Sequence, residues 1–225
     1  MIKVSAIQMQ MSEDTDANIR NAEMLVREAS RNGAKIILLP ELFSSLYFCK
    51  DMDEKYFSLA SELKDNTLIE KFASLAKELG IVLLVSYFEK SDAEYFNSLV
   101  VVDANGTIMD NYRKTHIPCG PGYEEKFYFK PGDSGFKVYD TRYGKIGVGI
   151  CWDQWFCETA RALCLMGAEI IFYPTAIGSE PEIGVDSKDH WQRVQMGHAA
   201  TNTTPVVVAN RIGEEVGESC TLTFY

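Results

Sequence analysis

A cysteine follows an apolar run in the stretch GKIGVGICWDQWFCE, residues 144–158. Ile146, Val148 and Ile150 alternate with small residues, a pattern that predicts a strand leading to Cys151. Side chains at the carboxyl ends of strands in open α/β sheets face the ligand crevice, so this thiol is placed to attack an electrophile. The alternative is an ordinary buried cysteine. We interpret Cys151 as a nucleophile and expect its thiolate to be the favoured state.

A nucleophilic thiol requires a base, and Glu41 is the first candidate. It follows the apolar run 35–39 within LLPELF, between a proline and two large apolar residues. A carboxylate just beyond a buried strand can act as a general base. The alternative is a loop glutamate that caps the next segment.

A cation follows a later strand, in the segment YRKTHIP. Lys114 is a candidate catalytic cation, and the alternative is a solvated loop lysine. Glu124 and Glu125 come next within GPGYEEKFYFKPGD, a loop rich in glycine, proline and aromatic residues. Loops of this composition commonly line sites, although the aromatic residues can equally pack a long connection.

The composition is that of one globular domain. With 225 residues, 46% hydrophobic and 24% charged, the chain can bury one substantial core, so we expect a single domain over residues 1–225. No apolar run is long enough for a bilayer and no signal peptide is evident, which favours a cytoplasmic protein. The net charge of −10 argues against nucleic acid and anionic membranes as partners and is compatible with a cationic ligand.

Cysteine and histidine are spaced unlike disulfide frameworks or zinc sites. The six cysteines include no Cys-x-x-Cys pair, and the three histidines are not grouped like metal ligands. We therefore expect neither disulfides nor a metal site. We assign His190 and His198 to ordinary helix packing.

Helical and apolar segments alternate along the chain. Thr67 and Glu70 have the spacing of a capping box, and Asn105-Gly106 predicts a hairpin turn. Because this hairpin adds an antiparallel pair to strands that follow helices, we expect a mixed sheet. The predicted helices are 16–32, 67–79, 157–166 and 187–201, and the predicted strands are 2–8, 35–39, 81–88, 98–102, 107–112, 146–150, 169–173, 205–209 and 221–225.

The contexts LLPELF, YRKTHIP and GVGICWDQWF, in this order, resemble the nitrilase superfamily of carbon–nitrogen hydrolases over nearly the whole chain. The resemblance implies an α/β fold, a four-layer α-β-β-α sandwich with two mixed sheets. It implies a triad of Glu41 as base, Lys114 as oxyanion partner and Cys151 as nucleophile. Glu125 would orient the triad, and the backbone N–H of Trp152 would share the oxyanion. No metal or organic cofactor is needed, and a homo-oligomer is expected.

The segments YPTAIGSEP and DQWF resemble the branch that hydrolyses N-carbamoylputrescine to putrescine, carbon dioxide and ammonia. Tyr47 and Glu180 match positions that line the pocket in that branch, and Glu180 can pair with the substrate ammonium. The alternative for Glu180 is a solvated loop acid. Two other interpretations stay open. A β-ureidopropionase-like or ω-amidase-like sibling would need a cation for its substrate's carboxylate, and an inactive interaction module would retain only the fold.

The chain stops within the predicted strand 221–225, whereas the family pattern continues with further strands. We therefore expect a domain truncated at its C-terminal end, with an incomplete second sheet. An incomplete sheet leaves an unpaired edge, which lowers stability or recruits another chain.

Overall fold

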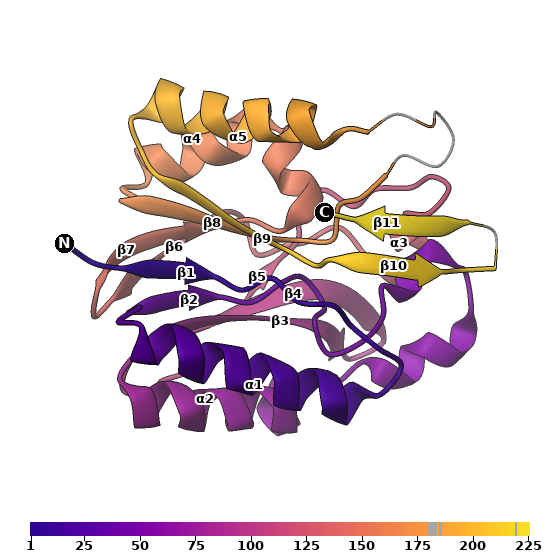
Figure 1. Ribbon diagram of the computed structural model, residues 1–225, viewed down its shortest axis with the longest axis horizontal. Coiled ribbons are helices and arrows are strands. Elements are labelled where there is room, and N and C mark those ends of the chain that lie inside the picture. The colour runs from indigo at the N-terminus through magenta and orange to yellow at the C-terminus, as the bar shows by residue number, and fades with distance from the viewer. Residues whose placement is uncertain (180–183, 185, 219) are drawn as a thin grey trace.

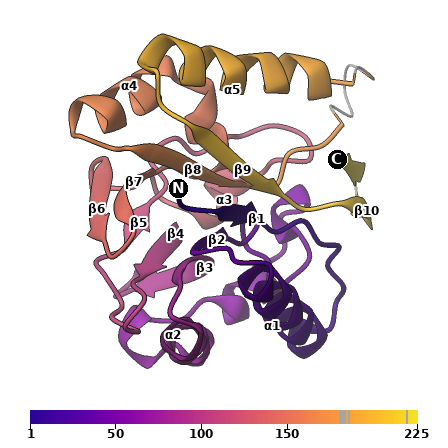
Figure 2. The ribbon, with the colours of Figure 1, turned by 60° about the vertical axis from the view of Figure 1, so that its left-hand side comes forward.

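Two mixed sheets face each other, and helices cover both outer faces (Figure 1, Figure 2). The computed structural model describes residues 1–179, 184, 186–218 and 220–225. The predicted four-layer α-β-β-α sandwich is confirmed.

The first sheet has five strands in the order β1-β2-β3-β4-β5. β1, β2 and β3 are parallel, and β4 and β5 extend the sheet antiparallel. The carboxyl end of β2 therefore lies beside that of β3, at the edge where Glu41 follows. The strands are β1 Val4–Ala6, β2 Ile36–Leu38, β3 Val82–Ser91, β4 Glu94–Val102 and β5 Tyr112–Arg113.

The second sheet has four strands in the order β6-β7-β8-β9, with β6 antiparallel to β7 and the other pairs parallel. A separate two-stranded ribbon pairs β10 with β11, and the predicted last strand lies in this ribbon. The strands are β6 Lys137–Thr141, β7 Gly144–Val148, β8 Ile170–Thr175, β9 Val206–Asn210, β10 Gly213–Val216 and β11 Thr221–Phe224.

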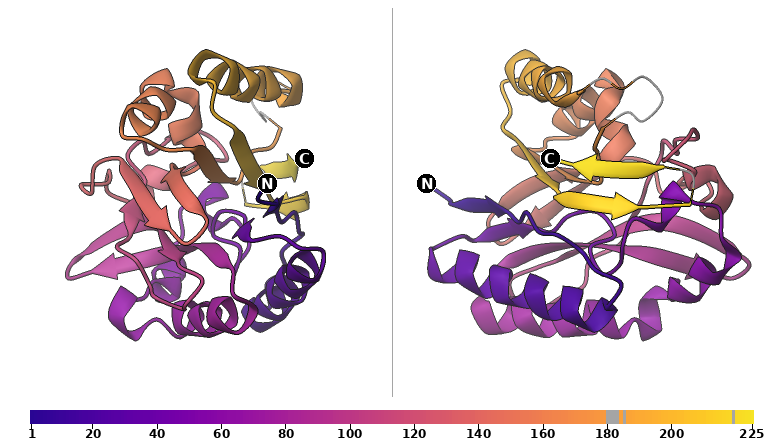
Figure 3. Two further views of the ribbon diagram at one scale, coloured as in Figure 1. Left: turned by 90° about the vertical axis from the view of Figure 1, so that its left-hand side faces the viewer. Right: turned by 45° about the vertical axis from the view of Figure 1, so that its right-hand side comes forward.

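Two long helices cover each sheet, α1 and α2 on the first and α4 and α5 on the second (Figure 3). None of the described helices is both long and apolar enough to cross a membrane. The helices are α1 Thr15–Arg31, α2 Thr67–Leu79, α3 Glu125–Tyr128, α4 Cys157–Leu165 and α5 Lys188–Asn202, and the 3₁₀ turns are η1 Phe48–Lys50, η2 Glu54–Leu59, η3 Leu63–Asp65 and η4 Cys151–Trp155.

Alternation along the strands explains the layers. In β2, Ile36 and Leu38 face the core between the two sheets, where they join Val148 and Phe172 of the second sheet. Ile37, between them, packs instead toward α1 and α2. Both faces of β2 are therefore covered, which is why this strand is apolar throughout.

Two local predictions are corrected. The capping box is wrong, because α2 is capped by Asn66, whose side chain accepts the Ile69 N–H at 3.1 Å, and Thr67 is already helical. Asparagine is at least as good an N-cap as threonine. The predicted strand 107–112 is also wrong. After the turn, Ile108 makes only an isolated bridge to Val102, and regular pairing resumes at β5.

Candidate active site

Glu41 lies in a turn beyond β2, and the turn is held from two sides. The next residue, Leu42, has a φ of +48°, a left-handed conformation that costs a non-glycine residue about 1–3 kcal/mol. Its N–H donates to Ser86 Oγ at 3.1 Å. The Glu41 carbonyl accepts from Arg211 Nη2 at 2.8 Å. Because Ser86 and Arg211 are both buried, they hold the turn, and with it the Glu41 side chain, in a fixed direction.

Lys114 follows β5 and lies between two carboxylates. Its Nζ donates to Glu41 Oε1 at 3.0 Å and to both oxygens of Glu125 at 2.7 Å. All three side chains are fully buried. The structure thus brings Glu41, Lys114 and Glu125 together, whereas Glu124 extends to Cys119 at 3.7 Å.

The cluster of Lys114, Glu41 and Glu125 holds one ammonium and two carboxyl groups, so a single cation faces two acidic groups. Burial works to lower the pKa of Lys114, but the charges of Glu125 and Glu41 outweigh it and raise this pKa well above its usual range. Lys114 therefore stays cationic. Burial raises the pKa of Glu125, and the nearby Glu41 charge adds to this rise, whereas Lys114 opposes it.

Cys151 begins η4 and is separated from the end of β7 by Gly149 and Ile150. Its φ of +43° turns the chain sharply away from the strand. The turn needs space: a Cβ on Gly149 would lie 2.6 Å from the Tyr173 ring. β7, which overlaps the predicted strand 146–150, thus places the Cys151 thiol at the carboxyl edge of the second sheet.

The expectation that the Cys151 thiolate is the favoured state is wrong. Burial raises the pKa of this thiol well above its usual range, and the Glu41 charge raises it further. Lys114 and the Ala176 N–H act in the opposite direction without reversing the shift. The neutral thiol is therefore the favoured state of Cys151 in the resting site.

Residues 3–223 match the carbon–nitrogen hydrolase family. The chain belongs to this family. It is 53% identical to an N-carbamoylputrescine amidase of Arabidopsis thaliana, with 100% of this chain and 77% of the relative covered. It is 51% identical to a citrullinase of Francisella tularensis, with 100% and 79% covered. A carbon–nitrogen hydrolase from Helicobacter pylori has a similar crystal structure, with a TM-score of 0.92, 36% identity, and 100% and 80% covered.

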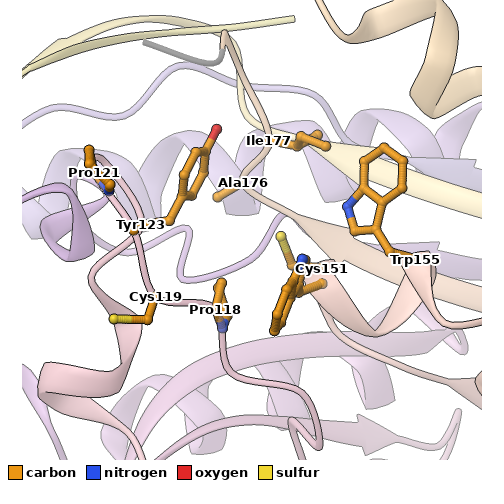
Figure 4. A pocket seen from close by; sticks show the side chains of 10 residues that line it. Pro118, Cys119, Pro121, Tyr123, Cys151, Trp155, Ala176 and Ile177 are labelled. Atoms are coloured by element: carbon orange, nitrogen blue, oxygen red, sulfur yellow. The ribbon is translucent and has the colours of Figure 1, made fainter. Parts of the chain in front are cut away.

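A cavity of about 270 Å³ reaches Cys151 in this carbon–nitrogen hydrolase. Figure 4 shows Tyr123, Ile177 and Trp155 around the Cys151 side chain. The lining residues are Pro118, Cys119, Gly120, Pro121, Tyr123, Cys151, Trp152, Trp155, Ala176 and Ile177. Within the described lining there is no lysine, arginine, aspartate or glutamate.

Sequence reasoning missed the residue that anchors η4. The Asp153 side chain is fully buried and accepts four hydrogen bonds. The donors are the N–H of Ile150 at 2.9 Å, the N–H of His116 at 2.9 Å, Tyr112 Oη at 2.8 Å and His116 Nδ1 at 2.7 Å. Asp153 therefore fixes the backbone on both sides of Cys151.

The two predicted substrate-binding residues have different outcomes. Tyr47 is buried, and its hydroxyl donates to Glu125 Oε1 at 2.7 Å, so in this structure it holds Glu125 and is not among the cavity-lining residues. Glu180 lies outside the described residues.

The histidines pack as the sequence suggested. His190 stacks on Trp155 with ring centroids 5.4 Å apart, and His198 Nε2 contacts the Gln154 carbonyl at 2.7 Å. Among the described residues, no cluster of three or more histidine, cysteine, aspartate or glutamate side chains is suited to hold a metal ion.

Proposed function

We propose that this chain hydrolyses N-carbamoylputrescine to putrescine, carbon dioxide and ammonia, with Cys151 as nucleophile, Glu41 as base and Lys114 as oxyanion partner. The observation that carries the proposal is the buried pairing of Glu41 with Lys114 beside the buried Cys151 side chain. The high identity to a plant N-carbamoylputrescine amidase supports the substrate.

Each group has one task in the proposed mechanism. Glu41 accepts the thiol proton as Cys151 Sγ bonds to the ureido carbon. The resulting oxyanion faces the Lys114 ammonium and the Trp152 N–H, which lies in the first turn of η4, where amides lack intrahelical acceptors. Glu41 then returns its proton to the leaving nitrogen, so that ammonia departs and an alkylcarbamoyl thioester remains on Cys151.

Water completes the turnover on the same base. Glu41 takes a proton from water as its oxygen attacks the thioester carbon, and the proton passes to Cys151 Sγ as the carbon–sulfur bond breaks. The released carbamic acid decomposes to carbon dioxide and putrescine. These steps use only acid–base and nucleophilic chemistry of the chain's own residues.

The cavity chemistry favours a substrate whose remote end carries an ammonium and no carboxylate. Trp152, Trp155 and Tyr123 offer aromatic faces to a cation. A buried carboxylate would need a cationic partner, and the described lining offers none. We propose that Glu180 pairs with the ammonium, as the sequence suggested.

Ammonia release from three ureido substrates tests this proposal. We expect kcat/KM for N-carbamoylputrescine to exceed that for citrulline and for N-carbamoyl-β-alanine by at least about tenfold, because an unpaired carboxylate loses its hydration in the cavity. A preference for citrulline would assign the chain to the citrullinase type. A preference for N-carbamoyl-β-alanine would assign it to the ureidopropionase type, and no release from any of the three would leave an inactive module.

We also propose a homo-oligomer. Met196 on α5 is 70% exposed and lines an apolar hollow with Trp191 and Val208. Association would bury these side chains, whereas a concentration-independent monomer mass by light scattering would contradict the proposal.

A further inference from the structure

Asn97 contacts both members of the buried ion pair. It lies in β4 and is fully buried. Its Nδ2 donates to Glu41 Oε1 at 2.7 Å, and its backbone carbonyl accepts the Lys114 N–H at 2.8 Å. Asn97, in the hairpin of β3 and β4, therefore sets the position of the Glu41 carboxylate and of the Lys114 backbone.

The two oxygens of Glu41 are thereby made unequal. Oε1 accepts from Asn97 Nδ2 and from Lys114 Nζ. Oε2 is equally buried and has no hydrogen-bond partner among the described residues. Since two donors occupy Oε1, Oε2 is the oxygen left to receive a proton.

The orientation of the Asn97 amide depends on Glu41. A reversed amide would place its oxygen against a carboxylate oxygen, so the contact at 2.7 Å identifies Nδ2 as the donor. In this orientation Asn97 Oδ1 is buried without a partner in the described part of the chain. An unpaired buried carbonyl lowers stability, so packing alone does not account for an asparagine here.

We propose that Asn97 is a positioning residue that holds Glu41 Oε1 so that Oε2 receives the Cys151 proton. The inference rests on the proposed function for the identity of base and nucleophile. It adds that the amide of Asn97 determines which oxygen of Glu41 acts.

A substitution at Asn97 acts on a site that is already crowded with charge. The groups that interact electrostatically with Glu41 are Lys114, Glu125, Cys151, Tyr47 and Cys49. Asn97→Asp would place a further carboxylate against Glu41. Two adjacent carboxylates resist joint ionisation, so the base would become available only at higher pH.

The experiment compares Asn97→Asp, Asn97→Leu and the control Asn111→Asp. The control is matched because Asn111 Nδ2 donates to another glutamate, Glu89 Oε2, at 2.8 Å, away from the cavity-lining residues. Iodoacetamide alkylation of Cys151, followed by mass spectrometry across pH, reports base-assisted deprotonation without any substrate. Ammonia release from N-carbamoylputrescine and the melting temperature are measured in parallel.

For Asn97→Asp we expect the acidic limb of both pH profiles to move upward by at least about one pH unit, and for Asn111→Asp no movement. For Asn97→Leu we expect kcat to fall by about ten- to a hundredfold, as when a hydrogen bond to a charged group is lost, with the melting temperature retained.

Unchanged limbs in Asn97→Asp, or equal shifts in Asn97→Asp and Asn111→Asp, would overturn the inference. So would Asn97→Leu with a lower melting temperature and an intact kcat, which is the behaviour of a purely structural asparagine. If Asn97→Leu does not fold, the Asn97→Asp alkylation profile decides alone. If the native chain alkylates at Cys151 but releases no ammonia, the proposed function fails while the alkylation comparison still tests Asn97.

Discussion

Replacing Cys151 by alanine is expected to reduce kcat by on the order of 10⁴-fold or more, because no other group can form the covalent intermediate. The substitution removes one sulfur atom from a buried position beside Ala176. Small truncations of buried side chains cost stability only moderately, so the fold should persist. Steady-state ammonia release and circular dichroism measure the two effects.

Cys164→Ala is the matched control. Cys164 is a half-buried thiol on α4 whose Sγ lies 3.4 Å from Thr204 Oγ1, and it does not line the Cys151 cavity. We expect kcat to stay near the native value in this variant. Native-like turnover in Cys151→Ala, or an equal loss in both variants, would refute Cys151 as nucleophile.

Replacing Lys114 by methionine should have the largest effect on stability. It leaves the carboxyl groups of Glu41 and Glu125 buried without their shared cation, and breaking such a pair costs about 3–5 kcal/mol. In a chain of this size the melting temperature should fall by roughly 6–20 °C. Turnover should also be lost, because the oxyanion loses its positive partner.

The deficit of Lys114→Met should depend on pH. Burial raises the pKa of Glu125 above its unfolded value of 4.5, and Lys114 is the main group that opposes this rise. A group with a raised folded-state pKa contributes stability that is present below its unfolded pKa and lost as pH rises through the folded pKa. Removing Lys114 strengthens this effect, so the difference in melting temperature from the native chain should be larger at pH 8 than at pH 5.

Lys130→Met provides the comparison for charge loss at the surface. The Lys130 side chain is 65% exposed and lies 3.8 Å from Glu94. Exposed pairs of this kind contribute little, so no measurable change in melting temperature is expected. A pH-independent deficit in Lys114→Met no larger than that of Lys130→Met would contradict the buried ion pair.

The positions of Glu41 and Cys151 could be predicted because each follows a run with a clear apolar pattern. Lys114 could be singled out as a cation beyond the predicted hairpin, although the strand predicted before it, 107–112, is wrong. Strand ends meet at sheet edges, so residues far apart in sequence converge. The family resemblance singled out Glu125 as an orienting glutamate, and in the structure Glu125, not the adjacent Glu124, contacts Lys114.

The supporting residues could not be predicted in the same way. No sequence pattern marks Asn97 or Asp153 as a supporting residue, and only tertiary contacts reveal what they hold. Arg211 reaches the Glu41 turn from the far end of the chain. The protonation of Cys151 depends on burial and on the Glu41 charge together, and neither quantity can be read from a linear motif.

Intact-mass spectrometry of the acid-quenched chain during turnover of N-carbamoylputrescine tests whether Cys151 carries a covalent intermediate. We expect the native chain to gain the mass of the substrate minus ammonia. This added mass should lie on the Cys151 peptide and be absent from Cys151→Ala. Turnover with no adduct on Cys151 under any quench time, or the same adduct on Cys151→Ala, would contradict covalent catalysis by the Glu41–Lys114–Cys151 triad.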